Sequence, residues 1–398
     1  MRLVVIGDVG VVDDMMHIGD EAMFEALRDE LTARGADIVA LSSAPHETAA
    51  RYGIRSIARI GFTGLDRSAS EARLAAVLAA AEGGAPLAAG DPAAAVISAV
   101  ASADGVVVAG GGNLASTWPL HVYERAALAG IAERLGRAFV ITGQTFGPRL
   151  EGRDRELVGG MLRSAALVGV RESASRALAA ELGVEARVGV DDASFLAWDA
   201  PSPPAGASSG VLVSLSLSLG DAPRAQTVRA IARLLDAAAD AEGGRVVFHA
   251  HFGPEHGGTR RGDEVLHDEV RAEMRTPSLV IPTGGSGGAA ALARGAGLLI
   301  TGRYHPAVFA APAGVPVLGL VTDEYTAVKQ RGALEHWGQG AVVPITRAER
   351  EGIPLVGSLR ARRPDIQAEA SERRPLHRRD ASSWWDLVAD RLSSAGVA

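Results

Sequence analysis

The sequence predicts an α/β protein made of two doubly wound domains with parallel sheets, and three observations lead to this prediction. Short runs rich in Val, Ile and Leu alternate with amphipathic stretches of helical length, as in chains of βαβ units. Runs such as 105–109 are apolar without alternation, as expected of strands that are covered on both faces. A segment rich in Pro, Gly and Ser at 199–209 interrupts this pattern, which then resumes, so it is expected to link two domains.

The alternation also sets the boundaries of the expected elements. We expect strands at 2–7, 37–42, 105–109, 138–142, 166–170, 210–217, 244–249, 297–301 and 316–320, and helices near 20–34, 69–82, 119–135 and 172–182. Two domains of similar size follow, at 1–200 and 205–357, with a cleft between them.

The last part of the chain, residues 358–398, differs from both domains in composition. Arginines cluster at 360–379, which predicts a solvated and partly mobile tract. Weak contact with an anionic membrane or a lipid-linked acceptor is the alternative. Trp384 and Trp385 then open an apolar-faced helix that is expected to reach about residue 394 and to dock through these two side chains.

Composition excludes several classes of function. The 398 residues carry a formal net charge of −7, so no global field recruits nucleic acid. The absence of cysteine excludes disulfides, thiolate nucleophiles and cysteine-based metal sites. No apolar run reaches the ~20 residues that span a bilayer, and the N-terminal stretch lacks the apolar core of a signal peptide. We therefore expect a cytoplasmic protein that is not integral to a membrane.

Polar residues follow several strands of the first expected domain, where ligands bind in open α/β sheets. Asp8 follows the first strand, and Gly19, Asp20 and Glu21 open the next helix. An acid-led helix start does not favour phosphate. It could bind sugar hydroxyls or only cap the helix. The spacing is not that of a dinucleotide fingerprint.

Later strands are followed by glycines, amides or a cation. The loop at 110–113 allows close backbone approach, Gln144 lies at another strand end, and Arg171 ends the strand at 166–170. Arg171 could bind an anion or pair with a nearby acid.

The second domain holds the strongest local signal. Its strand at 297–301 leads into Arg303 and His305, and Pro306 fits a first helical turn. The pair indicates an anion for the arginine and a proton for the histidine, although a capping histidine beside a solvated arginine would look the same. The glycine-rich stretch at 282–288, which includes Ser286, could cradle a phosphate or form a flexible turn.

Two further features leave alternatives open. Lys329 is the only lysine among 40 basic residues, which suits either a site that needs a compact ammonium or a remnant of codon bias. His249, His251 and His256, with Glu255, lack convincing ligand spacing, so we expect no metal site.

The order of these motifs resembles the polysaccharide pyruvyl transferases over roughly residues 1–345. The series comprises the first strand with Asp8, Gly19-Asp20-Glu21-Ala22, Gly110-Gly111-Gly112, Gly143-Gln144, Gly147-Pro148, Arg171-Glu172 with Ser175, Asp191 or Asp192 before Phe195, and Arg303-Tyr304-His305. The resemblance implies a GT-B-like architecture of two Rossmann-like domains. It also implies phosphoenolpyruvate as donor substrate, a sugar or lipid-linked saccharide as acceptor, and no cofactor or metal.

The resemblance and the strand-end positions together suggest roles for individual residues. His305 is expected to be the catalytic acid, and Arg303 and Arg171, with Lys329 and Ser286, to bind phosphoenolpyruvate. The expected acceptor-binding residues are Asp8, His17, Gly19, Asp20, Glu21, Gly111, Gly112, Asn113 and Gln144.

The sequence departs from the family pattern at three points. His17 stands where the family usually has Asn, behind an enlarged acidic loop at 11–16. Tyr304 replaces a Leu, and the stretch around Tyr325 lacks the family lysine, whose role Lys329 or Tyr325 could take.

The alternatives to a pyruvyl transferase are a nucleotide-sugar-dependent glycosyltransferase and a non-catalytic sugar-binding relative. The acceptor sugar and the oligomeric state, a homo-oligomer among the options, are not legible.

Overall fold

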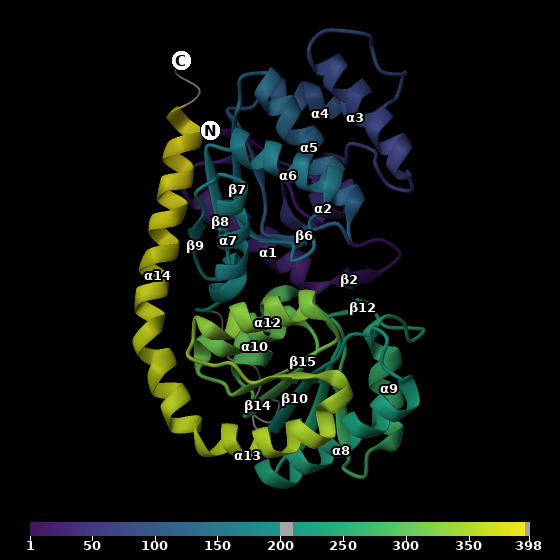
Figure 1. The fold of residues 1–398 in the computed structure, drawn as a ribbon, viewed down its shortest axis with the longest axis vertical. Helices are drawn as coiled ribbons and strands as arrows, with labels where there is room; N and C mark the ends of the chain where they lie inside the picture. Colours follow the sequence, from purple (N-terminus) through teal and green to yellow (C-terminus); the bar gives the residue numbers. More distant parts are fainter. Residues whose placement is uncertain (200–209, 395–398) are drawn as a thin grey trace. The chain divides into compact units, whose positions relative to one another are not determined.

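The computed structural model describes residues 1–199 and 210–394, and these fall into two compact units (Figure 1). Unit 1 comprises Met1–Val11, Met23–Asp192 and the chain from Arg379 on, and unit 2 comprises Val12–Ala22 and Ala193–Arg378. The expected linker at 199–209 lies almost entirely outside the described residues. Each unit is built around its own parallel sheet.

Unit 1 is a doubly wound sheet with strand order β4-β3-β1-β5-β7-β8-β9, and β6 pairs with β7. All of these pairings are parallel. Its strands are β1 (Arg2–Ile6), β3 (Asp37–Ser42), β4 (Arg55–Ala58), β5 (Gly105–Val108), β6 (Gly111–Leu114), β7 (Ala138–Phe146), β8 (Leu167–Val170) and β9 (Arg187–Val188). Its helices are α1 (Ile18–Ala33), whose first turn belongs to unit 2, and α2 (Pro45–Tyr52), α3 (Arg67–Ala81), α4 (Pro92–Ala101), α5 (Pro119–Arg134), α6 (Gly152–Ser164) and α7 (Ser173–Glu181). The 3₁₀ turn η1 (Asp192–Phe195) begins at the last residue of this part of unit 1 and continues into unit 2.

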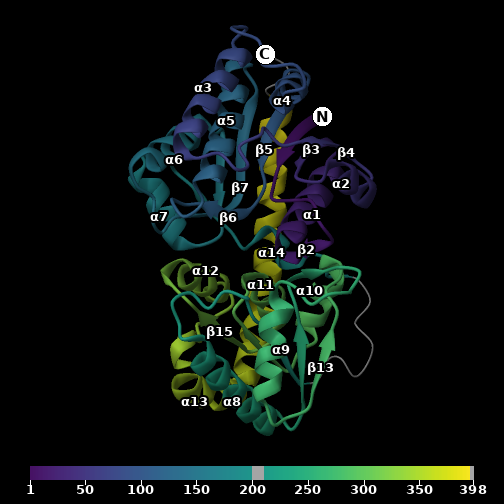
Figure 2. The same cartoon turned by 90° about the vertical axis from the view of Figure 1, so that its right-hand side faces the viewer.

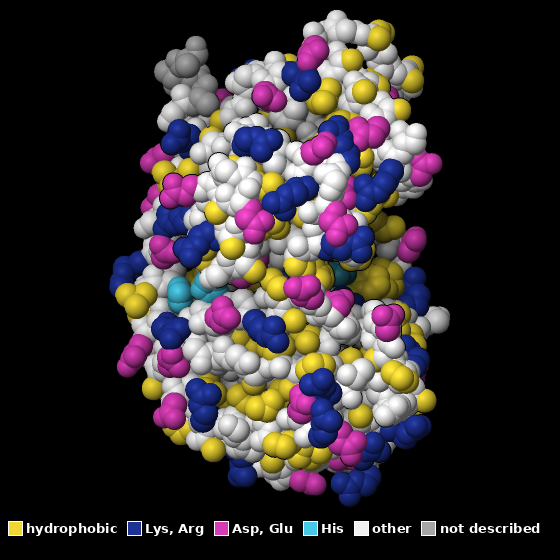
Figure 3. All heavy atoms as spheres, viewed as in Figure 1, with side chains coloured by type: hydrophobic (Ala, Val, Ile, Leu, Met, Phe, Trp, Pro, Cys, Tyr) yellow, Lys and Arg dark blue, Asp and Glu magenta, His cyan; other side chains and the backbone are white. Residues whose placement is uncertain are grey.

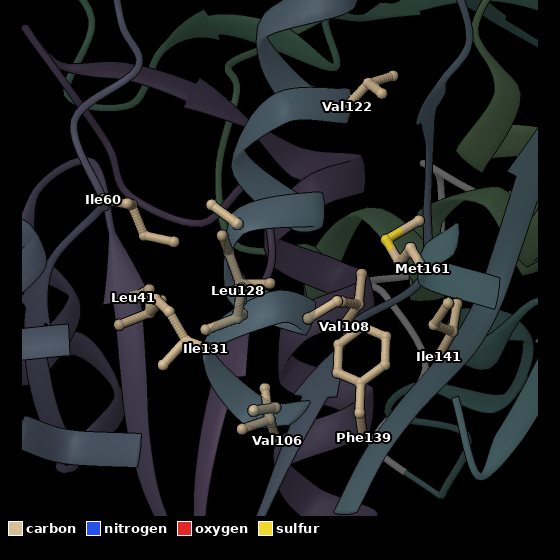
Figure 4. Close-up of a cluster of buried hydrophobic side chains, with 14 of the residues drawn as sticks. Leu41, Ile60, Val106, Val108, Val122, Leu128, Ile131, Phe139, Ile141 and Met161 are labelled. Carbon is tan, nitrogen blue, oxygen red and sulfur yellow. The ribbon is translucent and has the colours of Figure 1, made fainter. Parts of the chain in front are cut away.

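Both faces of this sheet are buried, which explains why its strands lack alternation. Val106 and Val108 pack with Leu128 and Ile131 of α5 in one cluster, shown in Figure 4, and Figure 2 gives a second view of α3, α5 and α6 on this face. Val107, between the two valines, joins the cluster on the opposite face, with α1 and the C-terminal helix. Successive strand residues point to opposite faces, so a sheet covered twice requires apolar residues at every position.

Unit 2 repeats this design with strand order β13-β11-β10-β14-β15-β16, the 3-2-1-4-5-6 order of a Rossmann fold. Its strands are β10 (Gly210–Ser214), β11 (Arg245–His249), β13 (Ser278–Ile281), β14 (Leu298–Thr301), β15 (Val317–Val321) and β16 (Val342–Pro344). Its helices are α8 (Arg224–Glu242), α9 (Asp263–Glu273), α10 (Ser286–Arg294), α11 (Tyr304–Ala310) and α12 (Glu324–Glu335), with 3₁₀ turns η2 (Ala311–Ala313) and η3 (Ile345–Arg347) and the π-turn η4 (Ala348–Gly352).

One N-terminal segment belongs to unit 2 and not to unit 1. The short strand β2 (Met15–His17) pairs antiparallel with β12 (Phe252–Pro254). Acidic residues of the preceding loop hold this segment, since the Asp14 carboxylate lies 2.7 Å from His256 Nδ1 and the Asp13 carbonyl accepts from Arg261. The simple expected boundary at residue 200 therefore differs from the observed division, in which Val12–Ala22 groups with unit 2.

The C-terminal tract corrects one expectation, because residues 358–380 are helical. Helix α13 (Ile353–Ala361) is followed by α14 (Arg363–Ser394), which starts well before Trp384 (Figure 1). Several of its arginines bind protein groups: Arg363 pairs with Glu242, and Arg374 donates to the carbonyl of Pro312. Trp384 and Trp385 are buried in unit 1, as expected. Specific partners, which composition does not reveal, thus order the tract.

Candidate active site

Each unit has a topological switch point, where ligands bind in doubly wound folds. In unit 1 it lies between β1 and β5, and in unit 2 between β10 and β14. Asp8 follows β1, the glycines at 110–112 follow β5, and Arg303 follows β14. The sequence-predicted residues therefore divide between the two switch points.

Arg303, at the unit 2 switch point, is anchored along one edge of its guanidinium. Its Nε and Nη2 donate to the two oxygens of Asp263, at 2.8 and 2.5 Å. Asp263 is fully buried and also accepts from the backbone amides of Leu217 and Phe252. Nη1 has no protein partner within the described chain, and the arginine side chain remains 21% exposed. The pair thus presents a fixed cation with an open edge to ligands.

His305 lies two residues further, in the first turn of α11. The residue is 8% exposed, and its ring lies against those of Tyr304 and Phe309, with centroids 5.1 and 6.0 Å away. Gly19 explains how the ring fits. A Cβ at position 19 would lie 2.1 Å from His305 Nδ1, so any side chain there would displace the imidazole.

The β2–β12 pairing brings further predicted residues to His305. Ile18 donates its amide to the carbonyl of His251, which fixes the start of α1 in unit 2. His17 Nδ1 lies 3.0 Å from Asp20 Oδ2. Burial lowers the pKa of His17, but the charge and hydrogen bond of Asp20 outweigh it, so the pKa is raised above its ordinary value. His17, Gly19 and Asp20, expected to bind the acceptor, therefore lie near Arg303 and His305, and Glu21 belongs to the same unit.

The other histidines of this region are buried and neutral. Burial, with the charge of His267, lowers the pKa of His249 to about 4, and burial also lowers the pKa of His267 to about 4. The pKa of His251 is held well below its ordinary value by burial and by neighbouring cationic groups. His267 Nε2 accepts a hydrogen bond from the amide of Leu215, which favours the neutral tautomer that carries its proton on Nδ1. These three side chains pack the unit and carry no charge near pH 7.

Lys329 and Ser286 occupy separate positions in unit 2. Lys329 Nζ lies 3.2 Å from the Tyr325 hydroxyl and 5.1 Å from the centre of the Tyr304 ring, next to His305 in sequence. Ser286 is the first residue of α10 and is buried. Lys329 therefore connects through Tyr304 to the Arg303–His305 segment.

Asp8 is the centre of a charged network at the unit 1 switch point. It accepts from Arg125 at 2.8 Å, from Arg59 at 3.1 Å and from the amide of Asn113, and His121 lies 3.3 Å away. Burial would raise the pKa of Asp8, but Arg125, His121 and Arg59 together hold it well below its ordinary value. Asp8 is an ionised acceptor of hydrogen bonds.

Two more predicted residues come together beside it. Gln144 donates to the carbonyl of Ala109 at 2.5 Å, and a Cβ on Gly111 would lie 3.0 Å from its Nε2. Gly111, Gly112 and Asn113 belong to β6, and Gly111 lies opposite Gln144 of β7.

Arg171, the other predicted donor ligand, is 1% exposed and engaged within unit 1. Its Nε donates to Thr145 at 2.9 Å and its Nη1 to Asp191 at 2.6 Å. The neighbouring Asp192 lies against Gly143 and Gly110. Burial, and then the charge of Asp191, raise the pKa of Asp192 to about 7. Arg171 thus neutralises one of two adjacent carboxyl groups.

Within residues 1–199 and 210–394, no three His, Asp or Glu side chains gather as a metal would require. Nor does any helix there combine the length and apolar character that crossing a bilayer demands. Acidic and basic side chains are interspersed over the face in Figure 3.

A family model decides the affiliation of the chain. The model for polysaccharide pyruvyl transferase matches residues 17–324, well over half of the sequence. The chain belongs to this family. The match confirms the resemblance and includes the His17 and Arg303–His305 segments of this family member. A search of curated proteins found no match.

Solved structures confirm the GT-B-like architecture. The UDP-GlcNAc 2-epimerase of Neisseria meningitidis, bound to UDP-GlcNAc, aligns with a TM-score of 0.62 at 10% identity, covering 99% of this chain and 100% of the other. A putative UDP-N-acetylglucosamine 2-epimerase from Listeria monocytogenes gives 0.58 at 13%, covering 93% and 90%. A spinosyn rhamnosyltransferase gives 0.54 at 15%, covering 98% and 99%. At these identities the likeness is one of fold.

Sequence reasoning missed several residues that build these sites. Asp263 opens α9 after a glycine, and this acid-led helix start was a readable signal. Arg59 and Arg125 gave no such signal, because they reach Asp8 from positions 51 and 117 residues away.

Proposed function

We propose that this family member transfers the pyruvyl group of phosphoenolpyruvate to two hydroxyls of one sugar, forms a ketal and releases phosphate. The observation that carries the proposal is the Arg303–His305 pair, at the end of β14 and inside the matched range. An arginine held along one edge by Asp263 offers its other edge to a carboxylate or phosphate.

The chemistry needs a proton, an electrophilic carbon and two additions. His305 gives a proton to the methylene carbon of the donor, which turns C2 into an electrophile. A sugar hydroxyl adds to C2 and loses its proton, the C2–O bond to phosphate breaks, and a second hydroxyl closes the ketal. A positioned acid contributes ~10²–10⁴-fold to such a step.

We assign the two substrates to different residues. Arg303, Lys329 and Ser286 of unit 2 are proposed to bind the donor anions, and Arg171 stays a predicted donor ligand from unit 1. The acceptor is proposed to bind near Asp8, whose ionised carboxylate can accept hydrogen bonds from sugar hydroxyls. Gly111, Gly112, Asn113 and Gln144 would complete that site.

A phosphate-release assay tests the proposal. The purified chain is mixed with phosphoenolpyruvate and a panel of free and lipid-linked sugars. We expect phosphate release that depends on the acceptor, together with a new ketal methyl signal in the product's NMR spectrum. Turnover is expected to survive dialysis against EDTA. Thermal stabilisation by a nucleotide diphosphate, without stabilisation by phosphoenolpyruvate, would instead support a nucleotide-sugar glycosyltransferase.

A further inference from the structure

His17 is the titratable group of this region whose role the proposed reaction leaves open. It ends β2, opposite Phe252 of β12, and the two rings lie 5.4 Å apart. The His17 side chain is 41% exposed, so a ligand can reach it. The chain next to His17 also contacts the proposed proton donor, because Gly19 lies against the ring of His305.

Charged groups face His17 from several elements. Asp20 of α1 lies at 3.0 Å, Asp263 of α9 acts in the same direction, and Arg303 before α11 acts in the opposite direction. His251, which follows β11, is neutral and interacts weakly. Asp20 is the dominant partner, so the imidazole is poised to hold a proton more strongly than an ordinary histidine.

The geometry also distinguishes the two ring nitrogens. Asp20 Oδ2 lies 3.0 Å from Nδ1, so its negative charge favours the tautomer with the proton on Nδ1 and the lone pair on Nε2. A carboxylate that holds an imidazole in one tautomer and stabilises its protonated form is the arrangement that makes a histidine an effective general base.

We propose that His17, positioned by Asp20, is the general base that takes the proton of the attacking sugar hydroxyl in the pyruvyl transfer. This inference rests on the proposed function. The hydroxyl oxygen bonds to C2 of the donor while its proton passes to Nε2 of His17, and His305 supplies the separate proton that C3 receives. The second hydroxyl proton leaves with phosphate, so charge and atoms balance.

The proposed roles of His17 as base and His305 as acid account for the residues at the start of α1. Gly19 lets His305 approach α1, and the same turn of chain carries Asp20 to His17. Asp20 is a positioning residue, because it acts through His17.

The pH dependence of kcat/KM tests the inference. A base must be unprotonated, so activity is expected to fall as pH drops through the pKa of His17. His17→Asn should remove this acidic limb and lower kcat at pH 7 by ~10²-fold or more. Asp20→Asn should move the limb to lower pH, because the partner that raises the pKa of His17 is gone. His46→Asn, at an exposed histidine of α2, is the matched control.

NMR titration of labelled histidines provides a readout that does not need turnover. The signal lost in His17→Asn identifies His17, and its pKa should fall in Asp20→Asn. If His17→Asn does not fold, the pH profile of kcat/KM in Asp20→Asn decides alone. A turning-over enzyme whose acidic limb is unchanged in either variant overturns the inference. A wild-type chain that releases no phosphate from phosphoenolpyruvate with any acceptor overturns the proposed function itself.

Discussion

Both units place an arginine after a parallel strand, yet the two arginines differ in what surrounds them. Arg171 follows β8, and its ion pair with Asp191 leaves the side chains 1% and 2% exposed. Arg303 follows β14, and its pair with Asp263 leaves the arginine 21% exposed. Arg171 engages Thr145 as well, whereas Arg303 keeps Nη1 clear of protein partners within the described chain.

The comparison teaches that a strand-end position does not by itself identify a ligand-binding arginine. Arg171 lies beside two adjacent carboxyl groups, Asp191 and Asp192, and we expect its ion pair with Asp191 to stabilise unit 1. Arg303 faces one carboxylate that backbone amides also satisfy. We therefore expect Arg303 to bind an anionic ligand and Arg171 to stabilise the fold.

Replacing Arg171 should have the largest effect on stability. Arg171→Ala leaves Asp191 buried without its guanidinium, which costs about 3–5 kcal/mol of unfolding free energy. Denaturant unfolding of both proteins measures this loss. Normal stability combined with lost affinity for phosphoenolpyruvate would make Arg171 a ligand, as the sequence predicts, and not a structural clamp.

Asp192→Asn should stabilise unit 1 in a pH-dependent way. The folded pKa is raised to about 7, so the native state binds more protons than the unfolded one between roughly pH 4 and 7, and stability falls as pH rises through this window. The Asn side chain of the variant has no carboxyl proton to lose, so its stability does not fall in this pH window. We expect a melting temperature above wild type at pH 8 and close to it at pH 4. A stabilisation that does not vary with pH would refute the assignment.

Arg303→Lys should weaken donor binding while still providing Asp263 with a cation. Charge-assisted hydrogen bonds contribute about 1.5–3 kcal/mol, and a lysine cannot hold Asp263 and a ligand along two edges. Calorimetry with phosphoenolpyruvate measures the change. Arg224→Lys is the matched control, because Arg224 makes an exposed two-point pair with Glu269. Equal affinity in the Arg303 and control variants would remove Arg303 from the donor site.

Lys329→Arg should have the smallest effect. If the ammonium contacts the donor, kcat/KM falls by roughly tenfold or less, because the positive charge is kept and only its compact shape changes. The Tyr304 and Tyr325 rings can stack on either cation. Steady-state kinetics decide the matter, and unchanged values would favour a remnant of codon bias.

The sequence predicted the fold well because strand and helix patterns are local. The strands around Val106 and Val140 could be predicted from their continuous apolar runs, because both faces of the sheet are buried. That Val12–Ala22 belongs to unit 2 could not be predicted, because β2 pairs with a strand more than two hundred residues away in the sequence. Nor could the helical order of 363–394, which depends on partners such as Glu242.

The candidate site was predicted in part for the same reason. Arg303 and His305 lie within one turn, so their joint placement after β14 follows from the strand and the proline. That His17 and Asp20 join them, and that Asp263 anchors Arg303, depends on contacts between distant segments. Local sequence can mark such residues as candidates, but it does not show which distant residues they contact.

His305→Gln tests the central claim most directly, when kcat, affinity for phosphoenolpyruvate and melting temperature are measured on one preparation. If His305 is the proton donor, kcat falls by at least ~10²-fold, and the alkaline limb of the pH–rate profile, where the acid loses its proton, disappears. Donor affinity changes much less, because Arg303 still binds the anion. A variant that is destabilised by about 0.5–2 kcal/mol yet turns over normally would show that His305 only stabilises the start of α11, and would contradict the account.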